Sequence, residues 1–264
     1  MEDTIITFIG TSACTPEAFH DTASFVINNK YLVDTGWCAV LKMLQYNLSP
    51  LDIEYLFITH CHHDHYIGLP HLIFYLAMKR KERKIRSSLK IVGPAADIQL
   101  VVKRAKSFLQ VERFPGADYV CEVIPIVPGE SFEVEEFRLD TCKTKHNVEG
   151  LCYKFTDKRT GVTFAFTGDT AYHPPIAQLA KHCFLLIHEA SHGPNASGSE
   201  PEAAHSGALD AARIAKMAEV ERLALIHCPE HLRKESLKVA KEIFPATFCP
   251  LEGQTIMLKS NDKL

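Results

Sequence analysis

One short segment constrains what this chain can fold into more than any other. Residues 59–65, Thr-His-Cys-His-His-Asp-His, directly follow the apolar run 54–58. Because side chains alternate in extended backbone, His60 and His62 should point to one side, and Asp64 and His65 should face a second point once the chain turns. Imidazole and carboxylate groups are ligands for zinc, and also for manganese or iron. The segment therefore predicts a site for two metal ions, against the weaker interpretation of a chance histidine cluster in a loop.

Composition bounds the class of protein. The chain has 264 residues, of which 46% are apolar and 23% charged, as is typical of a globular protein with a core. A net charge of -3 and a pI near 6.5 do not indicate a dedicated nucleic-acid binder. The N-terminus lacks a signal-peptide pattern, and no run of about 18 apolar residues occurs, so no membrane association is expected.

The nine cysteines are odd in number and include no Cys-x-x-Cys pair. A disulfide framework is therefore a poor interpretation, and a reducing, cytoplasmic location suits them better. Most of them lie in apolar runs, so we expect nearly all to be small residues of the core.

Apolar runs bounded by turn residues predict strands, and apolar residues at helical spacing predict helices. The expected strands span 4–10, 23–28, 30–34, 54–58, 89–93, 120–127, 132–134, 137–142, 151–155, 162–166, 184–188, 222–226 and 255–258. The expected helices span 37–46, 69–79, 96–110, 199–218 and 232–243, the fourth with Ser199 and Glu202 as a capping pair. Strands within 119–166 are expected to be antiparallel. With no linker visible, we expect one domain over 1–264, an α+β sandwich of two face-to-face sheets.

The segment 59–65 resembles the signature motif of the metallo-β-lactamase superfamily, and other motifs of that family have counterparts here. They are Asp34 in Asp-Thr-Gly, His146 between two strands, Asp169 in Thr-Gly-Asp-Thr, and His227 at a strand end. The resemblance runs from about Thr4 to His227 and implies a four-layer αββα sandwich with two divalent metal ions. It implies one ion bound by His60, His62 and His146, a second bound by Asp64, His65 and His227, and Asp169 bridging both. Zn²⁺ is the expected metal, with Mn²⁺ or Fe²⁺ as alternatives.

Further stretches resemble the ribonuclease Z branch of this superfamily: Gly10-Thr11 near the start, His188-Glu189-Ala190-Ser191, and Ala204-His205-Ser206. The resemblance implies that Glu189 and His205 assist proton transfer to a leaving group. A histidine hydrogen-bonded to a glutamate is held in one tautomer and keeps its proton near neutral pH. We expect His205 to open a helix whose dipole disfavours the imidazolium, an effect that Glu189 would oppose. The alternatives are a locally satisfied carboxylate and a polar helix start.

The chain also departs from ribonuclease Z. That family carries a long tRNA-binding arm between the third and fourth motifs, whereas His146 and Asp169 are only 23 positions apart, a span that two strands and a turn fill. RNA therefore remains a candidate substrate without the arm. The sequence His-Cys-Pro-Glu-His at 227–231 likewise replaces the His-Phe-Ser-x-Arg-Tyr of the family.

These observations lead to a hypothesis of metal-dependent hydrolysis. We expect a phosphodiesterase that uses a metal-bridging hydroxide, acting on a small-molecule or nucleotide phosphodiester, with Asp64 orienting the nucleophile and His205, paired with Glu189, protonating the departing oxygen. Lactone or thioester hydrolysis on the same metals is the first alternative, because the fold does not determine the substrate. A non-catalytic scaffold or RNA-binding subunit is the second. A homodimer is possible by resemblance.

A basic run at 79–86 is the remaining feature with a functional interpretation. It could contact phosphate or RNA. The favoured interpretation is a solvated helix C-terminus, where positive charge complements the helix dipole and the overall charge of the chain is negative.

Overall fold

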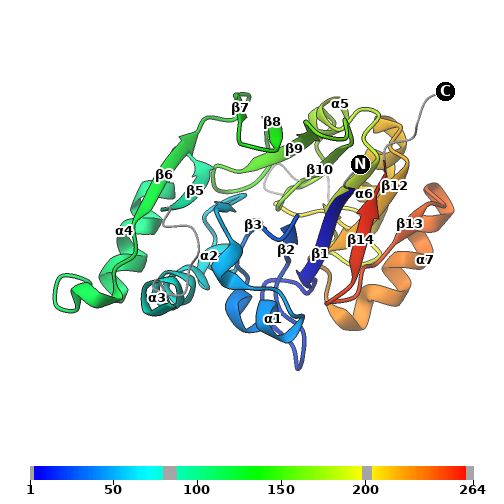
Figure 1. Cartoon of the computed structure of the whole chain (residues 1–264). Coiled ribbons are helices and arrows are strands. Elements are labelled where there is room, and N and C mark those ends of the chain that lie inside the picture. The colour runs from blue at the N-terminus through cyan, green and yellow to red at the C-terminus, as the bar shows by residue number, and fades with distance from the viewer. Residues whose placement is uncertain (1–2, 80–87, 198–203, 260–264) are drawn as a thin grey trace.

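The computed structural model describes residues 3–79, 88–197 and 204–259. Within these residues two seven-stranded sheets pack face to face, and helices cover both outer faces (Figure 1). The protein is therefore a four-layer αββα sandwich of the α+β class, which confirms the predicted fold class. The basic run lies outside the described residues except for Lys79, so the structure tests neither the favoured solvated helix C-terminus nor the phosphate contact.

The first sheet is mixed. Its strands β1, β2, β3 and β14 pair antiparallel, whereas β3, β4, β5 and β6 run parallel to one another. Across the sheet the order is β14 (Thr255–Leu258), β1 (Thr4–Gly10), β2 (Ser24–Ile27), β3 (Tyr31–Val33), β4 (Tyr55–Phe57), β5 (Leu89–Pro94) and β6 (Cys121–Ile126). The parallel pairs need long crossovers, which the intervening helices supply.

The second sheet repeats this arrangement. Strands β7, β8, β9 and β10 pair antiparallel, and β10, β11, β12 and β13 run parallel. The order is β13 (Thr247–Phe248), β12 (Arg222–Ile226), β11 (Leu185–Glu189), β10 (Thr163–Phe166), β9 (Leu151–Asp157), β8 (Phe137–Lys143) and β7 (Ser131–Glu133). Both sheets thus direct the carboxyl ends of several parallel strands toward one edge of the sandwich.

Helices pack on the two outer faces through separate apolar clusters. The first sheet is covered by α1 (Ala39–Gln45), α3 (Leu69–Lys79) and α4 (Ile98–Phe108). The second is covered by α5 (Pro175–Leu179), α6 (Ala208–Ala218) and α7 (Arg233–Ile243). A short helix, α2 (His63–Tyr66), lies at the edge, and 3-10 turns occupy Pro50–Asp52, Pro115–Ala117 and Glu230–Leu232. None of the helices in the described residues is long and apolar enough to cross a membrane.

The core between the sheets is rich in aromatic rings. Phe57 of the first sheet meets Phe155 of the second with ring centroids 5.4 Å apart, and Phe25 meets Phe166 at 5.2 Å, both edge to face. Such pairs add to the stabilisation that burial already provides, by about 0.5–1.5 kcal/mol each. This packing gives the loops at the edge of the sandwich a rigid base.

Two expectations about secondary structure were wrong. Helix α6 begins at Ala208, with Gly207 as its N-cap, and not near Ser199. The expected capping pair Ser199 and Glu202 lies outside the described residues. His205 therefore precedes the helix by three residues and does not open it. The strand β6 pairs parallel to β5 in the first sheet, so it does not belong to the antiparallel stretch expected over 119–166.

Candidate metal centre

The predicted ligands follow the carboxyl ends of strands. Because parallel strands end at the same edge of a sheet, side chains placed just beyond them converge there. Asp34 follows β3, His60 follows β4, Asp169 follows β10 and His227 follows β12. His146 lies in the loop between β8 and β9. Residues far apart in sequence therefore reach one place at the rim of the sandwich.

The histidine-rich segment turns into α2 at this edge. His62 is the residue that caps the helix, and its backbone is extended, with φ −82° and ψ 151°. The first turn then buries Asp64 and His65, while His63 is exposed and packs on Tyr66. The change from extended to helical backbone is why one short segment can face two points in space.

Three imidazoles form the first group of nitrogen atoms, which we call group one (His60, His62 and His146). The Nδ1 atom of His62 lies 3.2 Å from Nε2 of His60 and 2.9 Å from Nε2 of His146. Ring nitrogens this close need a shared proton or a cation between them, because the lone pairs of neutral imidazoles repel one another. His60 is buried, whereas His62 and His146 are half-buried.

A carboxylate and two imidazoles form group two (Asp64, His65 and His227). The Oδ2 atom of Asp64 lies 3.3 Å from Nε2 of His65 and 3.2 Å from Nε2 of His227. All three residues are buried. Group two therefore lies deeper than group one and carries a negative charge of its own.

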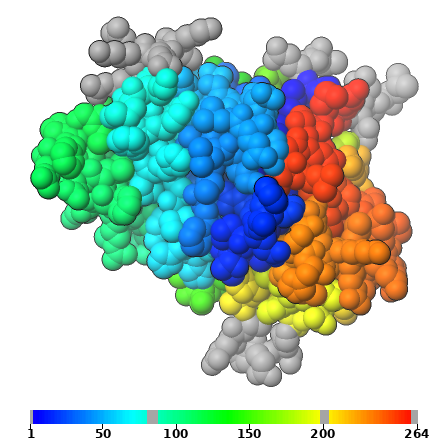
Figure 2. Space-filling model, turned by 90° about the horizontal axis from the view of Figure 1, so that it is seen from below, coloured from blue at the N-terminus to red at the C-terminus, as the bar shows by residue number. Residues whose placement is uncertain are grey.

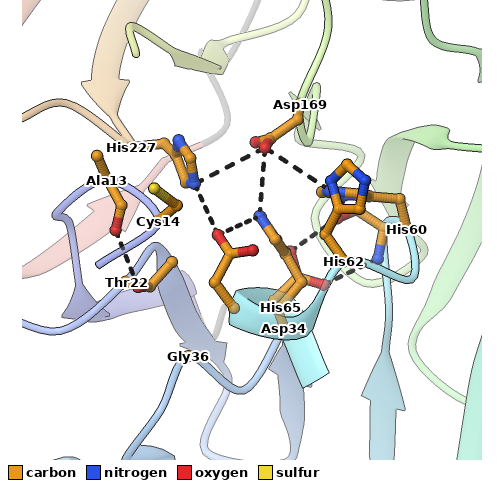
Figure 3. Close-up of polar contacts among 12 residues, drawn as sticks. Ala13, Cys14, Thr22, Asp34, Gly36, His60, His62, His65, Asp169 and His227 are labelled. Carbon is orange, nitrogen blue, oxygen red and sulfur yellow. Dashed lines mark hydrogen bonds and ion pairs between the residues drawn. The ribbon is translucent and has the colours of Figure 1, made fainter. Parts of the chain in front are cut away.

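Asp169 lies between the two groups. Its Oδ2 atom is 3.7 Å from Nε2 of His60 in group one, and 3.5 Å and 3.7 Å from Nε2 of His65 and His227 in group two. Figure 3 shows these rings directed toward the Asp169 carboxylate from different elements. Together with Asp169, each group brings four ligand atoms within 4.8 Å of one another. The arrangement offers ligand atoms for two adjacent cations with one carboxylate between them.

The donor atoms fit divalent cations in their chemistry and in their lack of other partners. Nε2 of His65 and Oδ1 of Asp169 are buried and form no hydrogen bond within the described residues. A buried polar atom without a partner costs about 1–3 kcal/mol of stability, so two such atoms side by side indicate a site that binds a ligand. Nitrogen and carboxylate oxygen are the donors that zinc, manganese and iron accept.

Asp34 orients one histidine in each group through hydrogen bonds. Its Oδ2 atom accepts a hydrogen bond from Nδ1 of His65 at 2.8 Å and one from the hydroxyl of Thr59 at 2.8 Å. Thr59 in turn contacts Nδ1 of His60 at 3.1 Å. These bonds leave the Nε2 atoms of both rings for a metal, which is how outer-shell partners orient ligating histidines. Asp34 itself has a left-handed backbone, with φ 51°, a strained conformation typical of functional sites.

Two of the remaining three rings, those of His146 and His227, have their own orienting partners, which the sequence did not identify. Nδ1 of His146 donates to the backbone carbonyl of Ala204 at 2.6 Å. Nδ1 of His227 contacts the hydroxyl of Ser191 at 2.7 Å. A backbone carbonyl has no sequence signal. Ser191 did have one, since it belongs to the His-Glu-Ala-Ser stretch, but no role was assigned to it.

The glycine before Asp169 shows why this turn is so tight. Gly168 has a left-handed backbone, with φ +57°, and a Cβ atom there would lie 2.7 Å from Cβ of Thr59. Any side chain would therefore push the Asp169 loop away from the histidine-rich segment. The Gly-Asp sequence lets the bridging carboxylate approach group one and group two at once.

The two groups differ in charge state. Burial lowers the pKa of all three histidines of group one, with repulsion between neighbouring rings adding to the effect. In group two burial acts in the same direction, but the carboxylates of Asp169 and Asp34 outweigh it and raise the pKa of His65 well above its usual range. Asp169 and Asp64 likewise raise the pKa of His227. The pKa shifts therefore favour neutral imidazoles in the first group and protonated imidazoles in the second.

Glu189 and His205 lie beside this centre. Nδ1 of His205 lies 3.1 Å from Oε1 of Glu189 and 3.7 Å from Oδ2 of Asp169. Glu189 is fully buried and is held by the backbone N–H groups of Thr170 and Ser191. Burial disfavours the imidazolium, but the hydrogen bond and charge of Glu189 raise the pKa of His205 to about 9. His205 is therefore protonated at neutral pH next to the candidate metal sites.

Comparison with known proteins places this geometry in a family. The family model described as "Anti-Pycsar protein Apyc1" matches residues 4–206, well over half of the chain. A ribonuclease Z of Methanothermobacter thermautotrophicus is 24% identical, with 97% of each chain covered. Among solved structures, the metallo-β-lactamase fold protein YhfI from Bacillus subtilis has a TM-score of 0.79 at 24% identity, covering 97% of this chain and 100% of that one. The human short form of tRNase Z has a TM-score of 0.77 at 21% identity, covering 96% and 98%.

Fold, site and sequence matches agree. The match of the family model covers the strands that carry Asp34, His60, His146 and Asp169, and the solved relatives share the sandwich over nearly the whole chain. The chain is thus a metal-dependent hydrolase that shares the fold of the metallo-β-lactamase fold protein YhfI and is similar to ribonuclease Z in sequence, and it belongs to the family of the anti-Pycsar protein Apyc1.

Proposed function

We propose that this protein is a binuclear phosphodiesterase that works through group one, group two and the His205–Glu189 pair. The observation that carries the proposal is the position of Asp169, whose Oδ2 atom lies within 3.7 Å of His60, His65, His227 and His205. A pair of cations beside a protonated imidazole suits an anionic substrate whose leaving oxygen needs a proton. Phosphodiesters meet both conditions.

Each residue has a distinct task in this proposal. Two bound divalent ions supply charge neutralisation and lower the pKa of water. Asp64 holds the attacking oxygen in line and accepts its proton, and its side chain keeps 12% exposure, against 3% for Asp169. Asp169 holds the two groups at a constant separation. His62 and His146 of group one are half-buried at the rim and leave access for the phosphate.

His205 is the proposed general acid. Its side chain is 31% exposed, so it reaches the rim of the site while Nδ1 stays bound to Glu189. That bond leaves Nε2 as the atom that donates a proton to the departing oxygen. A properly placed acid contributes about 10²–10⁴-fold to such a reaction.

The substrate class is proposed from what the site accommodates. The span between His146 and Asp169 holds β9, a turn and β10, with no further element. RNA therefore stays an alternative without a tRNA-binding arm, and a small-molecule or nucleotide phosphodiester is the first choice. The test is a panel with metal-loaded protein: bis-p-nitrophenyl phosphate, 3′,5′-cyclic nucleotides and precursor tRNA against lactones and thioesters. Turnover of lactones or thioesters alone would replace the proposal with the first alternative.

Zinc is the proposed metal, with manganese or iron as alternatives that the same ligands accept. Elemental analysis of the purified protein tests this and also tests the non-catalytic alternative. We expect two equivalents of metal per chain. Substoichiometric metal together with no hydrolysis would favour a scaffold or RNA-binding role.

We also propose a cytoplasmic homodimer in which the whole chain, 1–264, acts as one domain. The helices α3 and α4 lie side by side at one end of the molecule (Figure 2). Between them is an apolar groove of about 540 Å³ lined by Ile67, Pro70, His71, Phe74, Phe108 and Leu109. Phe74 is 43% exposed and Phe108 76%, and exposed apolar patches of this kind mark association sites. Sedimentation of the protein and of Phe74→Glu tests it: the variant should be monomeric.

A further inference from the structure

Two cysteines lie at the base of the loop that carries His146. Cys142 is near the end of β8 and Cys152 near the start of β9, and the two are directly opposite each other in the antiparallel register. The nine residues between them form the loop. Among the strand pairs of the described residues, this is the only pair with cysteine on both sides.

The two cysteines face each other across the strand pair, and they differ in access. Directly opposed residues of an antiparallel pair have Cβ atoms about 4.5–5.5 Å apart, so the two side chains are neighbours. Cys152 is fully buried in the apolar cluster beneath α5 and α6, whereas Cys142 is only half-buried at the edge of that cluster. An oxidant therefore reaches Cys142 first, with Cys152 already next to it.

We propose that Cys142 and Cys152 form a reversible disulfide under peroxide, and that this bond loosens metal binding by group one. The site is a modification site separate from the metal ligands, and formation of the bond does not depend on the proposed function. Only its effect on turnover does.

The chemistry balances with hydrogen peroxide as the oxidant. The Cys142 thiolate attacks one peroxide oxygen, giving the sulfenic acid and, after proton transfer, one water. The Cys152 sulfur then attacks the Cys142 sulfur, the S–S bond forms, and the hydroxyl leaves as a second water with the Cys152 proton. Overall two thiols are oxidised and one peroxide is reduced to two waters. The neighbouring Cys152 side chain lowers the pKa of Cys142, so the more accessible thiol is also the one that more readily forms the thiolate.

Forming the disulfide between Cys142 and Cys152 moves β8 and β9 slightly closer together at the base of the His146 loop. Cβ atoms of directly opposed residues are about 4.5–5.5 Å apart, whereas a disulfide needs about 3.8 Å. The strands must therefore move together by on the order of 1 Å at this position. Strained disulfides of this kind are the ones that reduce readily and serve regulation.

Backbone contacts connect the base of the His146 loop to the ligands of group one. Beyond the pair, Thr144 donates its backbone N–H to Gly150 at 3.2 Å, which closes the loop that holds His146. Leu151 donates to the carbonyl of Thr59 at 2.8 Å, and Gly150 forms a bridge with His60. Two of the three ligands of group one are thus tied to the loop base. Disturbing the supports of ligands lowers metal affinity by about 10–100-fold.

The experiment uses the full chain loaded with zinc, so that the metal itself does not react with peroxide. After treatment and blocking of remaining thiols, trypsin should release the peptides 139–143 and 146–154 joined by a disulfide, at the mass that corresponds to loss of two hydrogens. A competing chelator should then remove one zinc roughly tenfold more easily. Dithiothreitol should restore both the mass and the zinc affinity.

Matched variants separate the pair from general oxidation. Cys142→Ser should lose the linked peptide and keep its zinc under peroxide, whereas Cys121→Ser, a half-buried cysteine of β6, should behave as the unaltered protein. Cys152→Ala provides a second test should Cys142→Ser fold poorly. Two results overturn the proposal: no linked peptide under peroxide that fully oxidises the exposed Cys14, or equal zinc loss in Cys142→Ser. Because peptide mass and zinc content are read directly, an absence of phosphodiesterase activity would count against the proposed function and not against the disulfide.

Discussion

Group one and group two lie side by side around Asp169, yet they offer a cation different kinds of ligand atom. Group one has three neutral imidazoles, two of them half-buried at the rim. Group two replaces one imidazole by the Asp64 carboxylate, and all its members are buried. Group one therefore offers nitrogen ligands that solvent can reach, and group two offers a negatively charged ligand that is buried.

The difference predicts unequal affinity. An additional unit charge at 4 Å from a cation contributes on the order of 4 kcal/mol at the effective dielectric of a protein surface. Desolvation and proton competition offset part of that, but the sign favours group two near neutral pH. Under the proposed function we therefore expect the rim position to exchange metal more readily than the deeper position.

The largest expected effect comes from removing what the two groups share. Asp169→Asn keeps the size of the side chain and removes the charge that faces both groups. We expect both metals to be lost in dialysis and kcat/KM to fall about a thousandfold or more. Elemental analysis and turnover of bis-p-nitrophenyl phosphate measure this. The control is Asp140→Asn on β8, whose carboxylate bonds Ser131 and Arg138 away from the site. Loss of a single metal would mean that the bridge serves only one group.

A smaller effect is expected at His205, whose ring centroid is 5.0 Å from that of His146 and 6.2 Å from that of His227. His205→Ala should keep both metals and lower kcat about a hundredfold on alkyl phosphodiesters. On a p-nitrophenyl ester, whose leaving group needs little protonation, the loss should be much smaller. Equal losses on both substrates would remove the assignment of general acid.

Much of this centre follows from sequence because its ligands are local. Residues His60 to His65 lie in one segment, and a strand end followed by a turn needs no knowledge of the rest of the fold. The distant members Asp34, Asp169 and His227 are also strand-end residues, so the carboxyl edge of a sheet brings them together. In the structure His60, His65 and His227 each have a ring nitrogen within 3.7 Å of the Asp169 carboxylate. Asp34 bonds to His65 at 2.8 Å.

The errors have a different origin. The Ser199 and Glu202 pattern is a short signal of a helix start, but α6 begins where Gly207 and Asp210 close a capping arrangement beside the loop at Asn195. That choice depends on tertiary contacts. The strand β6 was assigned to the wrong group because an alternating run does not specify its pairing partner. Likewise the carbonyl of Ala204, which orients His146, belongs to the backbone and leaves no trace in the sequence.

Metal release should sharpen the comparison between the groups, with an effect of roughly tenfold in affinity per pH unit. In the metal-free chain the carboxylates raise the pKa of His65 and His227 despite burial, so a cation entering group two must displace protons. Its affinity therefore falls as pH falls. Burial lowers the pKa of the group one histidines, so that affinity should change little over the same range.

Titration with a competing chelator at pH 8 and pH 6, with proton release followed in parallel, measures both equivalents. We expect the tight equivalent to weaken and to release protons, and the loose equivalent to stay nearly constant. Identical pH dependence for the two equivalents would contradict the distinction drawn here between the groups.

The smallest effect is a shift of a pH profile. In the proposed mechanism His205 acts in its protonated form, so its pKa, about 9 in the metal-free chain, sets the alkaline limb of the activity profile. Glu189→Gln removes the charge that raises this pKa while keeping an oxygen for the backbone N–H of Thr170. Burial, which lowers the pKa, then acts without opposition, so the alkaline limb should move down by about one pH unit or more. The profile of kcat/KM for an alkyl phosphodiester measures it, with Glu130→Gln as the control, because the Glu130 carboxylate accepts a hydrogen bond from the backbone N–H of Val127 in a turn. An unchanged limb would show that a group other than His205 donates the proton.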